Sequence, residues 1–226
     1  WYLSVNLKNH ENLNDHLLPG LNPIGVSKNL INTVFTFKYG NFQKLKKLIN
    51  DKKIGIIIME IARYDNPNID FIKKIRNICN QKNIVLIFDE CTTGFRNNLG
   101  GLHLKTKINP DIAMFGKAIA NGYALTAIIG KKEIMKRAEN SFISSTFWGE
   151  RSGFIAALKT IEIMREIKSW KTILSNGKYI QNEWKRIAKK NNLKIKIRGI
   201  DTIISFELIG LDNQIYKSFI TQEMLN

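Results

Sequence analysis

Apolar residues follow two different spacings in the first part of the chain. Residues 54–59 form an almost continuous apolar run, which is typical of a strand buried on both faces of a parallel sheet. Farther along, Ile69, Ile72, Ile75 and Cys79 recur every three or four positions, which predicts the buried face of a helix. The change of spacing within some twenty-five residues predicts a strand followed by a helix.

Further apolar runs predict three more strands, at 84–88, 112–115 and 125–129. This alternation of strands and helices predicts an α/β sheet with crossover helices. In such a sheet, ligands bind beyond the carboxyl ends of the strands. Polar residues that directly follow a predicted strand are therefore the candidates for chemistry.

The pattern changes toward the end of the chain. Helical periodicity at 154–167 and at about 173–190 gives way to residues 193–198, in which apolar and basic side chains alternate. A second extended run follows at 202–208. The opening forty residues, by contrast, carry Pro-Gly and Asn-Pro pairs that predict loops.

Length and composition agree with one domain and part of another. The chain has 226 residues, 44% of them hydrophobic, which is enough for a sizeable core. We predict that residues 1–172 are part of a large domain and that residues 173–226 begin a smaller α+β domain. The chain starts without an initiator Met or the features of a signal peptide, which predicts that the protein begins upstream.

The formal net charge of +16 raises a second class of function, a basic nucleic-acid-binding module. The lysines are spread along the chain rather than gathered in one block, which favours an ordinary solvated surface. Two cysteines without metal spacing predict a reducing, cytoplasmic setting. No apolar run reaches the roughly 18–20 residues of a membrane span. We therefore expect neither a nucleic acid nor a membrane as partner.

Three acidic or basic sites follow predicted strands: Glu60, Asp89-Glu90 and Lys117. An apolar strand ending in Asp-Glu is also found at the Mg²⁺ site of P-loop NTPases. That class needs a Gly-x-x-x-x-Gly-Lys-Ser/Thr loop, and here Gly116-Lys117 is followed by Ala118. The missing loop argues against an NTPase.

Lys117 is the stronger candidate. It follows Gly116, which lets the backbone come close to a ligand, and it lies where cofactors bind in α/β sheets. A partly desolvated Lys amine is a nucleophile for an aldehyde. An Asp at the end of a neighbouring strand, here Asp89, can hold a pyridine nitrogen protonated, so that the ring withdraws electrons. The pair predicts a pyridoxal 5'-phosphate (PLP) enzyme.

The motifs around these two residues resemble the class III PLP-dependent aminotransferases. The resemblance rests on the runs 88–96, 100–101, 110–111 and 116–117. It covers nearly the whole chain and, through residues 59–60, 95–96 and 145–147, comes nearest to the glutamate-1-semialdehyde aminomutase-like branch. The resemblance implies fold type I, a mostly parallel sheet with helices on both faces. It also implies a homodimer with active sites built from both subunits.

The resemblance also implies roles for single residues. Lys117 would form the Schiff base with PLP, and Asp89 would hold the pyridine nitrogen. Cys91 stands where the family usually has a Val packed against the cofactor ring. Thr146 matches a Thr that contacts the phosphate bound to the neighbouring subunit, although alone it would predict only a turn or cap. Glu60 is a possible site-lining residue. The phosphate-cradling turn and the ring-stacking aromatic would lie upstream.

The implied function is an aminotransferase that moves an amino group between an amino acid and an aldehyde or ketone. Lys117 would be both the covalent anchor and the acid–base group. An aminomutase, which moves the amino group within one molecule, would use the same residues. The segment 1–20 lacks the Gly-rich stretch expected of a glutamate-1-semialdehyde mutase, which favours the aminotransferase.

Overall fold

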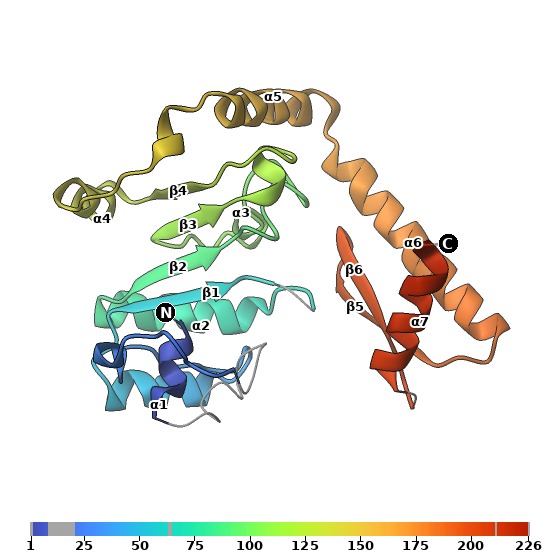
Figure 1. Cartoon of the computed structure of the whole chain (residues 1–226), viewed down its shortest axis with the longest axis horizontal. Helices are drawn as coiled ribbons and strands as arrows, with labels where there is room; N and C mark the ends of the chain where they lie inside the picture. The colour runs from blue at the N-terminus through green and yellow to red at the C-terminus, as the bar shows by residue number, and fades with distance from the viewer. Residues whose placement is uncertain (1, 9–20, 63–64, 211, 226) are drawn as a thin grey trace. The chain divides into compact units, whose positions relative to one another are not determined.

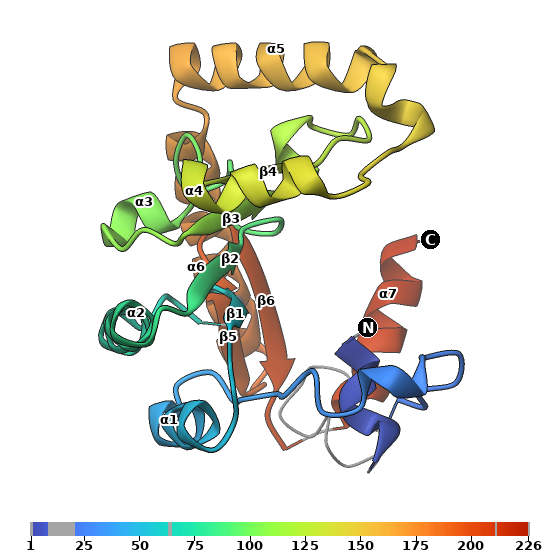
Figure 2. The same cartoon turned by 90° about the vertical axis from the view of Figure 1, so that its left-hand side faces the viewer.

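A computed structural model describes residues 2–8, 21–62, 65–210 and 212–225 (Figure 1, with the orthogonal view in Figure 2). The chain divides into two compact units. The first comprises residues 1–55 and 73–84, and the second comprises residues 56–72 and 85–226.

In its described residues the first unit contains the short 3-10 helices η1 (Tyr2–Leu7) and η3 (Lys28–Leu30) and the helix α1 (Phe42–Asp51). The sequence predicted loops for the first forty residues and made no prediction for α1. Its N-terminus is capped by the Asn41 side chain, which accepts a hydrogen bond from the Lys44 backbone N–H at 3.0 Å. Leu45 and Ile49 are its buried residues, four positions apart on one helix face.

Helix α2 (Ile69–Lys82) begins in the second unit and ends in the first. The Asn68 side chain accepts from the Phe71 backbone N–H at 3.0 Å and so caps its first turn. Ile72, Ile75 and Cys79 are fully buried, which confirms the helical spacing read from the sequence.

The sheet of the second unit has the strand order β1-β2-β3-β4. Its strands are β1 (Ile56–Glu60), β2 (Val85–Asp89), β3 (Ile112–Phe115) and β4 (Ala127–Gly130). β1, β2 and β3 are mutually parallel, and β4 pairs antiparallel with β3. The prediction of a mostly parallel α/β sheet is confirmed.

Burial of β1 corrects one expectation. Ile57 and Met59 are buried, but Ile56 is 60% exposed and Ile58 is 49% exposed. Successive side chains of a strand point to opposite faces, so only one face of β1 is covered by the described residues. The continuous apolar run predicted burial on both faces, and in this structure that prediction is wrong.

The connections that follow β2, β3 and β4 contain short helices: α3 (His103–Thr106), η4 (Lys117–Ile119), α4 (Lys132–Met135), η5 (Lys136–Asn140) and η6 (Thr146–Gly149). Two long helices come next, α5 (Ser152–Ile167) and α6 (Trp170–Lys190). Both were predicted, to within three residues at their starts. None of the helices in the described residues is long and apolar enough to span a membrane.

The chain continues with an antiparallel hairpin of β5 (Ile195–Ile200) and β6 (Ile203–Leu208), then α7 (Asn213–Leu225). The hairpin confirms the two extended runs read near the end of the sequence, and α7 was not predicted. The assignment of residues 173–226 to a separate small domain stays a prediction.

A cluster of buried side chains supports the segment that follows β3. Ala113, Phe115, Ile119, Ala120 and Ala157 form it. The Phe115 ring meets the Phe95 ring edge to face, with centroids 5.5 Å apart. Because β3 and η4 contribute to the same cluster, the backbone between them is fixed by packing on both sides.

Candidate active site

Lys117 lies at the turn from β3 into η4. Its backbone φ is +49°, in the left-handed region that a residue with a side chain adopts at a cost of about 1–3 kcal/mol. The following turn is closed by a hydrogen bond from the Ile119 N–H to the Gly116 carbonyl at 3.2 Å. Buried Ile119 then anchors the turn in the apolar cluster. A strained lysine backbone held by packing is typical of functional positions.

The Lys117 amine is exposed, and it donates a hydrogen bond to the Thr92 hydroxyl oxygen at 3.1 Å. The expectation of a partly desolvated lysine is therefore not met by the described residues. Gly116, which precedes Lys117, packs against Cys91 and Thr126: a Cβ there would lie 3.4 Å from Cys91 Sγ and 3.5 Å from a Thr126 methyl. The amine is free to receive a ligand from the solvent side.

Asp89 is the last residue of β2, and the parallel register places it between its two neighbours. Its Cα partners are Glu60 on β1 and Met114 on β3. Its Oδ1 accepts a hydrogen bond from the Cys91 backbone N–H at 3.0 Å. Since Lys117 follows the end of β3 by two residues, the carboxyl edge of the sheet carries two carboxylates and one amine.

The pKa of the Cys91 thiol depends on the charged residues at this edge of the sheet. Burial raises the pKa of its thiol to about 11, together with the hydrogen bond and negative charge of Asp89 and, more weakly, the charge of Glu60. The positive charge of Lys117 opposes this rise. Cys91 is therefore a neutral thiol at neutral pH, and Glu60, Asp89 and Lys117 all lie close enough to act on it.

Thr92 is the residue that sequence reasoning missed. It lies inside the run 88–96 that carried the resemblance, but its hydroxyl was given no role. The signal available was its position, three residues beyond a strand-end Asp that was already a candidate for cofactor binding. Its contact with Lys117 depends on how the loop turns back, and no spacing rule predicts that.

The structure leaves Thr146 outside this group. It is the first residue of η6 and is exposed. The segment that carries η6 follows the antiparallel strand β4, whereas Asp89 lies at the carboxyl end of β2 and Lys117 just after that of β3. The start of α5, where backbone N–H groups could bind an anion, is already contacted by a carboxylate of the chain. Glu150 accepts from the Ser152 N–H at 2.8 Å, and the bonds from Ser152 lower the Glu150 pKa.

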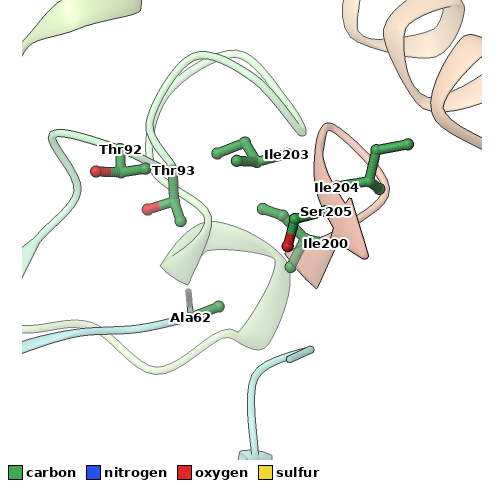
Figure 3. A pocket seen from close by; sticks show the side chains of 7 residues that line it. All are labelled: Ala62, Thr92, Thr93, Ile200, Ile203, Ile204 and Ser205. Atoms are coloured by element: carbon green, nitrogen blue, oxygen red, sulfur yellow. The ribbon is translucent and has the colours of Figure 1, made fainter. Parts of the chain in front are cut away.

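A small cavity of about 180 Å³ borders the loop that carries Thr92 (Figure 3). It is lined by Ala62, Thr92, Thr93, Ile200, Ile203, Ile204 and Ser205. Figure 3 shows the hydroxyls of Thr92 and Thr93 turned away from the isoleucines, so the threonine methyl groups face them. The cavity is thus mainly apolar, and it is not centred on Lys117.

The residues at the sheet edge suit the chemistry of PLP. An exposed amine can bond covalently to an aldehyde, and a carboxylate at the neighbouring strand end can pair with a protonated ring nitrogen. A neutral, half-buried thiol between them offers an apolar contact for a ring. Lys117, Asp89 and Cys91 are the residues that would hold the cofactor.

Comparison with solved structures defines the fold. The chain superposes on the FumI protein of Sphingopyxis sp. MTA144, solved in its PLP internal aldimine form, with a TM-score of 0.79 and 20% identity over 85% of this chain and 48% of that one. It also superposes on the ornithine δ-aminotransferase of Plasmodium falciparum, with a TM-score of 0.68 and 19% identity over 77% of this chain and 47% of that one. The fold is therefore that of the fold type I PLP-dependent transferases.

Sequence comparison defines the family. The profile of the aminotransferase class-III family matches residues 38–224. The 3-aminobutyryl-CoA aminotransferase of Cloacimonas acidaminovorans (strain Evry) is 33% identical over 184 residues, 77% of this chain and 44% of that protein. The glutamate-1-semialdehyde 2,1-aminomutase of Wigglesworthia glossinidia brevipalpis is 29% identical over 214 residues, 90% of this chain and 49% of that protein.

The chain belongs to the class-III aminotransferases, a family of PLP-dependent enzymes. It spans about half the length of the curated relatives it matches. Relatives of both kinds, aminotransferase and aminomutase, are similar to it at nearly the same level of identity. The similarity therefore fixes the family and the cofactor and leaves both reaction types open.

Proposed function

We propose that the protein is an aminotransferase that moves an amino group between an amino acid and an aldehyde or ketone, with Lys117 as its catalytic residue. The observation that carries the proposal is the exposed Lys117 amine at the same sheet edge as the Asp89 carboxylate. When bound, PLP supplies an aldehyde for that amine and an electron-withdrawing ring.

The chain's own groups divide the work. The Lys117 amine anchors the cofactor and, once released from it, takes and returns the proton that moves during amino transfer. The Thr92 hydroxyl accepts a hydrogen bond from Lys117 Nζ and so orients the amine. Asp89 keeps the ring nitrogen protonated by its negative charge. Cys91 packs against the ring, and Glu60 lines the edge of the site.

An aminomutase is the second candidate, because a glutamate-1-semialdehyde 2,1-aminomutase aligns with 90% of this chain. The two reactions differ in their need for a second substrate. An aminotransferase given one amino donor stops after a single turnover, whereas an aminomutase converts its one substrate continuously. Steady-state turnover with a single compound would identify the mutase.

We further propose a cytoplasmic homodimer with shared active sites, formed through the segment from residue 142 to residue 158. Apolar side chains there are unusually exposed: Phe142 is 99% exposed, Phe147 77% and Leu158 70%. A contiguous run of large exposed apolar side chains is typical of a protein interface. Thr146 lies within this run, so dimerisation would bring it to the phosphate of the neighbouring site.

Borohydride reduction tests the central proposal. The protein, expressed at the full length of its gene, is incubated with PLP, reduced, digested and mapped by mass spectrometry. We expect the label on Lys117, and Lys117→Ala to lower kcat by about 10³-fold or more because the acid–base group is gone. Lys189→Ala, an exposed lysine of α6, is the matched control and should behave as the parent. A label on another lysine would refute the assignment.

A further inference from the structure

The connection between β2 and β3, residues 90–111, contains little regular structure apart from α3, yet several of its residues are buried. Glu90 begins it, and its side chain is fully buried. Next to an Asp that faces the site, a buried Glu is unexpected, because an unpaired carboxylate is costly to bury. The carboxylate must therefore be satisfied inside the loop.

Four donors surround the Glu90 carboxylate. Oε1 accepts from the His103 backbone N–H and contacts His103 Nδ1, both at 2.8 Å. Oε2 accepts from the Leu102 backbone N–H at 3.0 Å and from the Thr93 hydroxyl. Burial alone would raise the pKa of Glu90, but the bonds from His103, Thr93 and the backbone N–H groups together lower it. The carboxylate is thus charged and holds both ends of the loop.

Backbone contacts complete this closure. The Glu90 N–H donates to the Met114 carbonyl at 2.9 Å, and the Gly94 N–H donates to the Glu90 carbonyl at 2.7 Å. A Cβ on Gly101 would lie 2.4 Å from His103 Nδ1 and 2.9 Å from Glu90 Oε1, so only glycine allows the approach. Glu90 therefore joins β3, the start of the loop and its end.

Thr92 lies within this closed loop, between Glu90 and its donor Thr93. Thr93, which follows Thr92, donates its hydroxyl to Glu90, and Cys91, which precedes Thr92, donates its backbone N–H to Asp89 Oδ1. The Thr92 hydroxyl itself accepts a hydrogen bond from Lys117 Nζ at 3.1 Å. Asp89 directly precedes Glu90 and shares its constraints. We propose that Glu90 is a positioning residue, whose buried carboxylate fixes Asp89 and Thr92 relative to Lys117. This inference rests on the proposed function.

Removing the Glu90 carboxylate should misalign Asp89 and Thr92 relative to Lys117 without removing any reacting group. Glu90 touches neither the amine nor the space beside it, so its removal leaves Lys117, Asp89 and Thr92 in the chain. Displacement of a positioned group by about 1 Å can cost about 100-fold in rate. A purely structural Glu90 would instead affect unfolding and leave the folded site unchanged.

The test uses PLP itself as the probe, because the substrates are unidentified. Four variants of the full-length protein are compared with the parent: Glu90→Gln, Thr93→Val, Thr93→Ser and Glu183→Gln. Thr93→Val removes one donor to Glu90 at constant shape, and Thr93→Ser keeps that donor. Glu183 is a half-exposed carboxylate of α6 paired with Arg186, so its change to Gln is the matched control. The readouts are the Kd for PLP, the pH midpoint of the visible band of bound PLP, and the Tm without PLP.

We expect Glu90→Gln and Thr93→Val to weaken PLP binding by about 10-fold and to shift the pH midpoint, in line with other outer-shell changes. Thr93→Ser and Glu183→Gln should match the parent. A lowered Tm with parent-like Kd and midpoint in both Glu90→Gln and Thr93→Val would overturn the inference. If Glu90→Gln does not fold, the Val and Ser variants of Thr93 decide by the same criteria. A parent without the PLP band would instead refute the proposed function, and the inference would fall with it.

Discussion

The carboxyl edge of the sheet and the segment from residue 142 to residue 158 differ in how their side chains are satisfied. At the sheet edge, each polar group described has a partner from the same chain, as Asp89 has in the Cys91 N–H and Lys117 in Thr92. In the other segment, large apolar side chains such as Phe142 and Phe147 are exposed. The polar groups of the first region are thus satisfied within one chain, whereas the exposed apolar side chains of the second would be covered in the proposed dimer.

The largest expected effect comes from removing the charge of Asp89 at the carboxyl edge of the sheet. Asp89→Asn should lower kcat by about 100-fold or more, because an amide cannot hold a ring nitrogen protonated by its charge. The Tm should change little, since the Cys91 N–H keeps an acceptor. Steady-state kinetics and thermal unfolding measure the two effects.

Asp111→Asn is the informative control for that prediction. Asp111 is buried, accepts from the Leu86 N–H at 2.8 Å and pairs with Lys131 at 2.6 Å, so its role is structural. We expect its variant to lose stability, by about 1–3 kcal/mol, and to keep the parent spectrum with PLP. Near-normal turnover of Asp89→Asn would show that Asp89 is structural as well.

Mixing two inactive variants tests whether the segment from residue 142 to residue 158 completes the active site of a neighbouring subunit. If sites are shared, a heterodimer of Lys117→Ala and Thr146→Val chains has one site with both changes and one with neither. Random assortment then restores about a quarter of parental activity, provided that the Thr146 change alone is severe. Activity after mixing and sedimentation velocity measure the outcome. An active monomer would return Thr146 to the role of a turn residue.

A third prediction concerns the interior of the first region. The pKa of Glu90 is lowered in the folded protein, so its charged form stabilises the fold above its ordinary pKa of 4.5. That contribution is lost as the pH falls through the lowered folded value. Urea unfolding between pH 7 and pH 3 should therefore show stability decreasing at the acid end, and Glu90→Gln should flatten this part of the curve. An unchanged slope in the variant would contradict the lowered pKa.

The smallest effect concerns Cys91. With a thiol pKa of about 11, Cys91 should react with iodoacetamide at pH 8 about 100-fold more slowly than an unperturbed thiol. Cys79 is fully buried and should not react in the folded state. Cys91→Val should leave kcat within about threefold, because both side chains offer a small apolar contact. Rapid labelling of Cys91 at pH 8 would disprove this environment.

The sequence predicted the parts of the molecule that depend on local pattern. Strand ends at Asp89 and near Lys117 were identified because apolar runs stop there, and parallel pairing then brings such ends to one edge. Helix α1 was within reach as well, since Asn41, Leu45 and Ile49 give a cap and a buried face. The Pro-Gly and Asn-Pro pairs that precede this helix predict loops and so obscure its pattern.

Burial and side-chain contacts depend instead on how segments distant in the sequence pack together. The exposure of Ile56 and Ile58 could not be predicted, because an apolar run does not show which faces are covered. Asp89 and Glu90 are adjacent acidic residues in different environments. Asp89 is half-buried at the edge of the sheet, whereas Glu90 is fully buried. Only the return of the loop, with Leu102 and His103 as donors, separates them. The contact of Thr92 with Lys117 depends on the same return.

The left-handed backbone of Lys117 has a consequence for how this position can change. A left-handed φ of +49° favours glycine and tolerates asparagine, so the local backbone gives no reason for a lysine. Replacement by glycine would relieve strain and make the fold more stable while it removed the amine. Selection for stability and selection for catalysis therefore oppose each other at this residue. In the proposed enzyme, the strained backbone at Lys117 is therefore a cost in stability that the catalytic role of the amine would maintain.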